Sequence, residues 1–90
     1  MSYRVFNGET TNTTSPTVRS FKSRHTIFCW GTFGSATVKV QLSAEGTEWF
    51  DEAAITFTAK GYASIELATD TKMRAVISGG TGASLHLAIV

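Results

Sequence analysis

Reactive side chains are scarce in this sequence, which has one cysteine, Cys29, and two histidines, His25 and His86. A single cysteine excludes an internal disulfide and any zinc site built from several cysteines. Neither histidine stands at a metal-binding spacing from the other or from a carboxylate. We therefore expect no metal site and no cofactor.

Charge is also scarce, since only 17% of the residues are Asp, Glu, Lys or Arg and the formal net charge is +1. Domains that bind nucleic acid usually have a pI above ~9, whereas this sequence has a pI of about 7.9. No apolar run approaches the ~18–20 residues of a membrane span, and the first residues lack the apolar stretch of a signal peptide. We predict no nucleic-acid or membrane partner and synthesis in a cytoplasm.

Motifs for catalysis are missing too. The sequence contains no Gly-x-Ser-x-Gly nucleophile turn. The glycine-rich residues 79–82 lack the Lys-Ser/Thr ending and the following helix of a phosphate loop. Cys29 lies in an alternating apolar run, which is typical of a buried, inert thiol. We predict that the protein is not an enzyme.

The sequence is rich in threonine and glycine, and its hydrophobic residues alternate with polar ones. In residues 36–42, for example, Ala36, Val38, Val40 and Leu42 share one face, as in a strand with one buried side. Similar runs occupy residues 3–6, 17–21, 25–30, 48–51, 54–58, 62–67, 72–78 and 84–90. These runs predict an all-β fold: a compact antiparallel β-sandwich, jelly-roll-like, with about eight short strands in one domain over residues 1–90.

The polar residues 9–16 interrupt this pattern after an Asn7-Gly8 pair that is typical of a turn. We expect the segment to be a polar loop or an arm. As a loop it would only connect strands, whereas an arm would become ordered on a partner.

Two charge clusters stand out from the neutral background. The basic cluster consists of Arg19, Lys22 and Arg24 next to His25, and the acidic cluster of Glu45, Glu48, Asp51 and Glu52. They are either solvated loops that keep the protein in solution or complementary rims on neighbouring copies. Exposed pairs contribute only ~0–1 kcal/mol each, so such rims would orient an assembly without holding it together.

Aromatic residues gather around the predicted turns: Trp30, Phe33, Trp49, Phe50 and Tyr62. We expect most of them to fill the core. An exposed Phe33, Phe50 or Tyr62 would instead anchor a protein interface or stack on a sugar ring. The candidate assembly contacts are Arg19, Lys22, Arg24, Phe33, Glu45, Glu48, Phe50 and Asp51.

The central stretch resembles a known family. Residues 31–43 and the following Glu45-Gly46-Thr47-Glu48-Trp49, together with residues 73–82, are similar to segments of small virion β-sandwich proteins of tailed bacteriophages. The resemblance covers residues 28–90, and it departs from the family at Glu45, where Asp is common, and at Met73, where an aromatic residue or valine is usual. It implies a structural role in the virion and brings no catalytic residues.

From this resemblance we expect a capsid decoration (cement) protein on the virion surface that binds the major capsid protein and stabilises the assembled head. A chain of this size would gain from further burial in a homo-oligomer, with a trimer favoured. Two alternatives stay open. One is a carbohydrate-binding or adhesion module of a tail fibre that uses aromatics such as Trp49 and Phe50, and the other is a neck or tail accessory protein.

Overall fold

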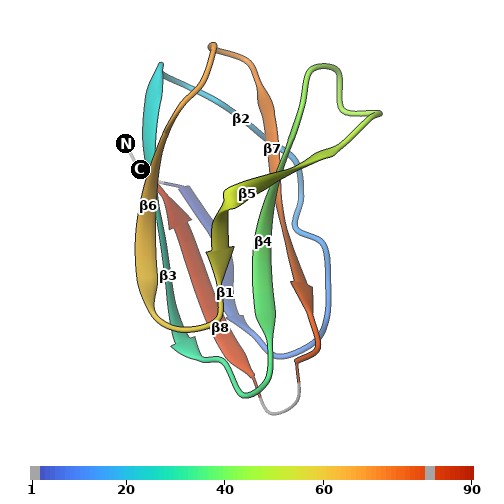
Figure 1. The fold of residues 1–90 in the computed structure, drawn as a ribbon, viewed down its shortest axis with the longest axis vertical. Coiled ribbons are helices and arrows are strands. Elements are labelled where there is room, and N and C mark those ends of the chain that lie inside the picture. Colours follow the sequence, from blue (N-terminus) through green and yellow to red (C-terminus); the bar gives the residue numbers. More distant parts are fainter. Residues whose placement is uncertain (1–2, 81–82) are drawn as a thin grey trace.

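The computed structural model describes residues 3–80 and 83–90, which form eight β-strands. In chain order the strands are β1 (Tyr3–Glu9), β2 (Val18–Arg19), β3 (Arg24–Thr32), β4 (Thr37–Ser43), β5 (Phe50–Phe57), β6 (Gly61–Glu66), β7 (Lys72–Ser78) and β8 (Ser84–Ile89). The start of β1 lies beside the end of β8, because Tyr3 pairs with Ile89 (Figure 1). In this part of the chain no helix is long and apolar enough to cross a membrane.

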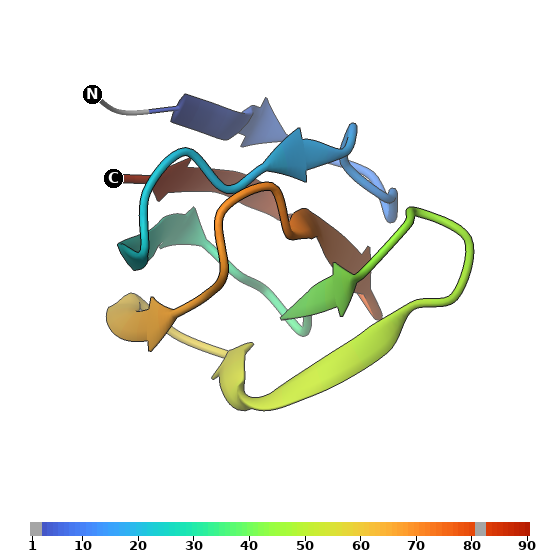
Figure 2. The same cartoon turned by 90° about the horizontal axis from the view of Figure 1, so that it is seen from above.

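The strands form two four-stranded sheets, which lie as two layers (Figure 2). We call the sheet β1-β8-β3-β6 the first sheet and the sheet β2-β7-β4-β5 the second sheet. All pairings are antiparallel. Four of them join β1 to β8, β2 to β7, β3 to β6 and β4 to β5, and two more join β3 to β8 and β4 to β7. Pairing the first strand with the last, and so on inward, is the arrangement of a jelly roll. The predicted all-β, jelly-roll-like sandwich is confirmed.

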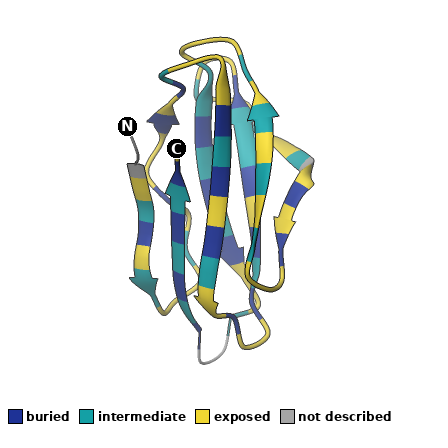
Figure 3. Cartoon of the chain, turned by 90° about the vertical axis from the view of Figure 1, so that its left-hand side faces the viewer, coloured by how far each residue is buried: buried dark blue, intermediate teal, exposed yellow. Residues whose placement is uncertain are grey.

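The period of two in the sequence decides which residues fill the space between the sheets. In β8, Leu85 and Leu87 are fully buried, and in β7 Met73 is too. Figure 3 views the molecule from the side of the first sheet and shows buried residues alternating with more exposed ones along its strands. Each strand therefore has an inner face in the core and an outer face whose side chains are available for other contacts.

Two predicted boundaries are wrong. Residues 48–51 and 54–58 were expected to be separate strands, but one strand, β5, spans Phe50–Phe57. A register shift opposite the Lys39 to Gln41 step of β4 absorbs the extra residues, as a β-bulge does. Gly8 does not end β1 in a turn: its φ of 76° lies at a second register shift, and the strand continues to Glu9.

The polar segment between β1 and β2 is held on the second sheet of its own chain. The Ser15 amide donates to the Ala75 carbonyl at 2.8 Å, and the Ser15 hydroxyl accepts from the Ala75 amide at 2.8 Å. The Ile77 amide donates to the Thr13 carbonyl at 2.8 Å. The segment therefore runs along β7 as a connection. Thr81 and Gly82 of the predicted glycine-rich turn lie outside the described residues.

Candidate binding surfaces

The outer face of the first sheet carries aromatic side chains. Along β3 the alternation buries Ile27 and Cys29 and directs Phe28 and Trp30 outward. Phe28 lies opposite Tyr62 of β6, with ring centroids 5.8 Å apart, and 40% of Phe28 and 71% of Tyr62 are exposed. We call this outer surface, with Phe28, Trp30, Tyr62 and the residues beside them, the aromatic face.

A stacked pair lies beside Phe28 and Tyr62. The rings of Trp30 and His86 are nearly parallel, with centroids 5.3 Å apart. The Arg4 guanidinium lies 4.9 Å from the Trp30 ring centroid and donates to the Asn7 side-chain oxygen at 3.2 Å. It also lies 3.5 Å from Nδ1 of His86, a contact that a donor such as arginine makes with an unprotonated ring nitrogen. The contacts among Arg4, Trp30 and His86 hold the two rings on the aromatic face.

Gly31 allows β3 and β8 to approach closely at this point. Its φ is 119°, and a Cβ atom there would overlap the carbonyl oxygen of Ser84 and come within 3.3 Å of the His86 ring. Only glycine tolerates both the backbone conformation and the space.

A groove lies on the aromatic face at the β6 edge. It has a volume of about 500 Å³ and is lined by Phe28, Cys29, Trp30, Lys60, Gly61 and Tyr62. Cys29 and Gly61 are partners across the β3–β6 ladder and form the floor, whereas the outward-facing rings of the neighbouring positions form the walls. Such a volume lies within the range of ~300–1,000 Å³ typical of small-ligand sites.

The loop joining β4 and β5 makes a second candidate surface, because it projects from the body of the sandwich (Figures 1 and 2). Phe50, at the start of β5, is 66% exposed. A hollow of about 90 Å³ beside it is lined by Ser43, Ala44, Glu45, Thr47, Glu48 and Phe50. We call this region the acidic hairpin tip. An exposed aromatic side chain beside two carboxylates, Glu45 and Glu48, resembles the anchor and polar rim of a protein interface.

Within the described residues the carboxylates of the acidic hairpin tip form no ion pair. Farther along the hairpin, Asp51 accepts a hydrogen bond from the Gln41 side chain at 2.8 Å. The predicted contacts Glu45 and Glu48 therefore have charges that no cation of the described chain neutralises.

The basic cluster is different, because its arginines contact carboxylates of the same chain. Arg19 lies 3.4 Å from Asp70, and Arg24 lies 2.9 Å from Glu66. The Lys22 ammonium lies 5.9 Å from the Phe21 ring centroid. The structure therefore does not pair the basic cluster with the acidic cluster within one chain.

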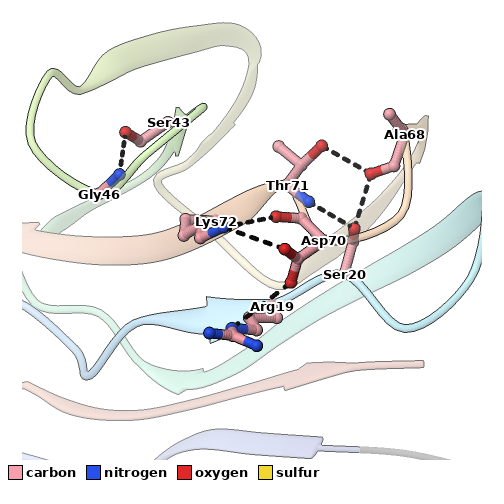
Figure 4. Close-up of polar contacts among 8 residues, drawn as sticks. All are labelled: Arg19, Ser20, Ser43, Gly46, Ala68, Asp70, Thr71 and Lys72. Atoms are coloured by element: carbon pink, nitrogen blue, oxygen red, sulfur yellow. Dashed lines mark hydrogen bonds and ion pairs between the residues drawn. The ribbon is translucent and has the colours of Figure 1, made fainter.

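Figure 4 shows how the Arg19 contact is held in place. Asp70 also accepts from Lys72 at 3.2 Å. The Ser20 hydroxyl donates to the Ala68 carbonyl at 2.7 Å and accepts from the Thr71 amide at 2.9 Å. These bonds fix the turn in which Asp70 adopts a φ of 72°. In this turn Arg19 and Lys72 share the single carboxylate of Asp70.

Several sequence predictions need correction. Phe33 was expected as an assembly contact, but it is 8% exposed and belongs to the core. His25 was grouped with the basic cluster, yet it is buried at the start of β3, edge-on to Phe21, with no hydrogen-bond partner for either ring nitrogen among the described residues. The expectation that most of the five turn aromatics are core is wrong, since Phe50 and Tyr62 are exposed and the two tryptophans are only partly buried.

The predicted burial of Cys29 is confirmed. Cys29 is buried, and burial raises the pKa of its thiol from 9.0 to about 12. Within the described residues no three His, Cys, Asp or Glu side chains lie close enough together to hold a metal ion.

Sequence analysis missed Arg4, Phe28 and His86 as surface residues. The alternation of residues 25–30 carried the signal for Phe28, because it places Phe28 and Trp30 on the same side of a strand. Nothing in the sequence indicated that β8 lies beside β3, which is what brings His86 onto Trp30.

Comparison with known proteins shows the fold and nothing more specific. No protein-family model and no curated protein matches the chain. The Drosophila melanogaster CENP-C cupin domain superposes with a TM-score of 0.52 at 12% identity, covering 97% of this chain and 56% of that chain. Drosophila melanogaster CENP-C bound to CAL1 gives 0.52 at 11% identity, covering 97% and 59%. The crystal structure of PirA gives 0.47 at 15% identity, covering 98% and 89%.

The chain thus spans less than two thirds of the length of the CENP-C chains it resembles. At these identities the likeness establishes a shared fold, and a shared jelly-roll fold does not imply a shared partner. The resemblance to phage virion proteins stays a prediction.

Proposed function

We propose that the protein is a structural component of a tailed-phage virion that binds the assembled head shell as a decoration protein. The observation that carries the proposal is Phe50, two-thirds exposed on a projecting hairpin between unneutralised carboxylates. Interface energy concentrates in a few aromatic anchors surrounded by polar groups, and this hairpin has that composition. The similarity of residues 28–90 to phage virion proteins supplies the choice of partner.

The partner surface on the major capsid protein would be an apolar pocket with a basic rim. Phe50 would fill the pocket, and Glu45 and Glu48 would set the register through opposite charges. A protein that binds only the assembled shell stabilises it by RT ln(1 + [L]/Kd), and repetition over many sites extends this effect to the whole head. Three copies around a symmetry axis would present three hairpins to the shell.

The test is co-sedimentation of the chain with unexpanded shells, expanded heads and isolated tails, each prepared without this protein. We expect saturable binding to expanded heads at a fixed ratio to the major capsid protein. Phe50→Ala should weaken this binding at least tenfold, and Glu48→Lys should slow association. Tyr62→Thr, on the aromatic face, is the matched control and should bind normally.

Other outcomes would overturn the proposal. Binding to tails alone would make the protein a fibre or neck component. Binding to none of the three particles, or binding that Phe50→Ala leaves unchanged, would exclude the hairpin as a head contact. Native mass spectrometry of the free protein tests the expected trimer separately.

A further inference from the structure

The aromatic face differs from the acidic hairpin tip, because it combines a groove, ring side chains and positive charge. Three of the four large hydrophobic residues that are exposed in the described chain belong to the first sheet or its immediate end: Phe28, Tyr62 and Val90. The chain's own segments leave them uncovered. We propose that the groove on this face binds an acidic sugar, a carboxylated pyranose unit of a polysaccharide. This inference does not depend on head binding.

The shape and lining of the groove suit a sugar ring. A pyranose has one face of C–H groups, which packs on aromatic rings, and an edge of hydroxyl groups, which needs polar partners. Phe28, Trp30 and Tyr62 provide rings around the floor formed by Cys29 and Gly61. The neighbouring row of the sheet provides hydroxyls, since the side chains of Thr26 and Ser64 lie 3.1 Å apart on the same outer surface.

The charge of the face selects an anion. Lys60 lines the groove, and no described ion pair engages it or Arg4. The polar partners of Arg4 are the neutral Asn7 and His86 side chains. Glu66, at the end of β6, forms an ion pair with Arg24 at 2.9 Å. A carboxylate on the ligand would therefore meet Lys60 without a competing acid beside the groove.

Nucleic acid and acidic peptides fit the same face less well. Binding of a single-stranded nucleic acid needs a row of cations that follows the backbone over several nucleotides. Here Arg4 lies on β1, one edge strand of the first sheet, whereas Lys60 directly precedes β6, the other edge strand. A peptide anchor would need a core depleted of charge, whereas Lys60 is one of the six lining residues.

The experiment is a titration of the full chain with a tetrasaccharide of galacturonate, followed by 15N NMR with the Trp30 indole N–H as reporter. We expect saturable shifts at Trp30, and affinity at least tenfold lower for the neutral tetrasaccharide of galactose. Tyr62→Thr should weaken binding of the acidic probe at least tenfold. Lys60→Gln should weaken binding of the acidic tetrasaccharide by a similar factor and leave binding of the neutral tetrasaccharide unchanged.

Phe50→Ala is the matched control, and it should bind the acidic probe like the wild type. The proposal is wrong if neither sugar shifts Trp30, if both bind equally, or if binding survives Tyr62→Thr. Preferential binding of a single-stranded decanucleotide would overturn it in favour of nucleic acid. Because Phe50→Ala and Tyr62→Thr act on different surfaces, failure of the sugar site and failure of head binding are distinguishable.

Discussion

The two sheets have the same number of strands and share one core, but the aromatic side chains on their outer faces are covered to different extents. On the second sheet, the Arg74 guanidinium lies 4.1 Å from the Trp49 ring centroid and donates to Gln41, which in turn donates to Asp51. On the first sheet, Tyr62 has no such cover and is 71% exposed.

The second sheet is also covered by the chain itself at its β2 edge. Thr14 forms a bridge with Val76, and Ser15 bonds to both polar backbone groups of Ala75. On the second sheet the polar side chains cover Trp49 and the paired segment covers an edge, so its large exposed hydrophobic residue among those described, Phe50, lies at the acidic hairpin tip. The first face keeps exposed apolar area that does not contribute to the stability of the isolated chain, and such area marks interaction sites in soluble proteins.

The largest expected effect comes from disturbing the close approach of β3 and β8 that supports the aromatic face. Gly31→Ala puts a methyl group against the Ser84 carbonyl at a φ of 119°, so β3 and β8 must separate or the backbone must change conformation. We expect a loss of about 3 kcal/mol in the free energy of unfolding, measured by urea denaturation. The Trp30–His86 stack should be lost with it.

Gly61→Ala is the control for Gly31→Ala. Its added methyl would meet the Phe57 ring at 3.7 Å and the Ala59 carbonyl oxygen at 3.9 Å, which are ordinary contacts, and its φ is not positive. Equal losses for the two variants would show that the position of Gly31 has no special constraint.

A second, smaller effect tests whether the core beneath the groove stays closed. Burial raises the pKa of Cys29 from 9.0 to about 12, so the folded state retains the thiol proton more strongly than the unfolded chain does. The resulting stability is complete below pH 9 and is lost as pH rises toward 12. We expect about 1 kcal/mol less stability at pH 10 than at pH 8 from this group, measured by urea denaturation.

Cys29→Ala should flatten this part of the pH profile. A wild-type profile with the same slope as Cys29→Ala between pH 8 and 10, together with rapid thiol labelling at pH 8, would mean that the floor of the groove opens readily.

How far the sequence predicts this architecture differs between inner and outer faces. Period-two alternation identified the core of β4, β7 and β8, because burial acts on every second residue and needs no knowledge of neighbours. The outer faces depend on which strands are adjacent. Phe28 and Tyr62 are 34 positions apart, and only the β3–β6 pairing brings their rings together.

Local patterns also failed where the chain departs from regular pairing. Asn7-Gly8 has the composition of a turn, but the pairing of β1 with β8 uses the positive φ of Gly8 for a bulge. Arg19 and Arg24 looked like free charges because their partners, Asp70 and Glu66, come from the distant β6–β7 region. Tertiary pairing, which the sequence does not state, decided each of these cases.

The third effect removes cover from the second face. Arg74→Met keeps much of the apolar stem but loses the guanidinium over Trp49 and the 2.7 Å bond to Gln41. We expect a loss of about 1 kcal/mol in stability. In a Trp30→Phe background, where Trp49 is the remaining tryptophan, its fluorescence should shift to the red. An unchanged spectrum would show that Arg74 does not shield Trp49 in solution.

The smallest expected effect decides what the aromatic face is for. Tyr62→Thr replaces an exposed ring by a strand-compatible side chain, so the free energy of unfolding should change by less than about 0.5 kcal/mol. Ile65→Thr is the matched change on the inner face of β6 and should cost more than 1 kcal/mol, because Ile65 packs against the core. If Tyr62→Thr costs as much as Ile65→Thr, the aromatic ring stabilises the sheet itself. If Tyr62→Thr leaves the free energy of unfolding nearly unchanged, the exposed ring does not stabilise the sheet, which favours a role in binding.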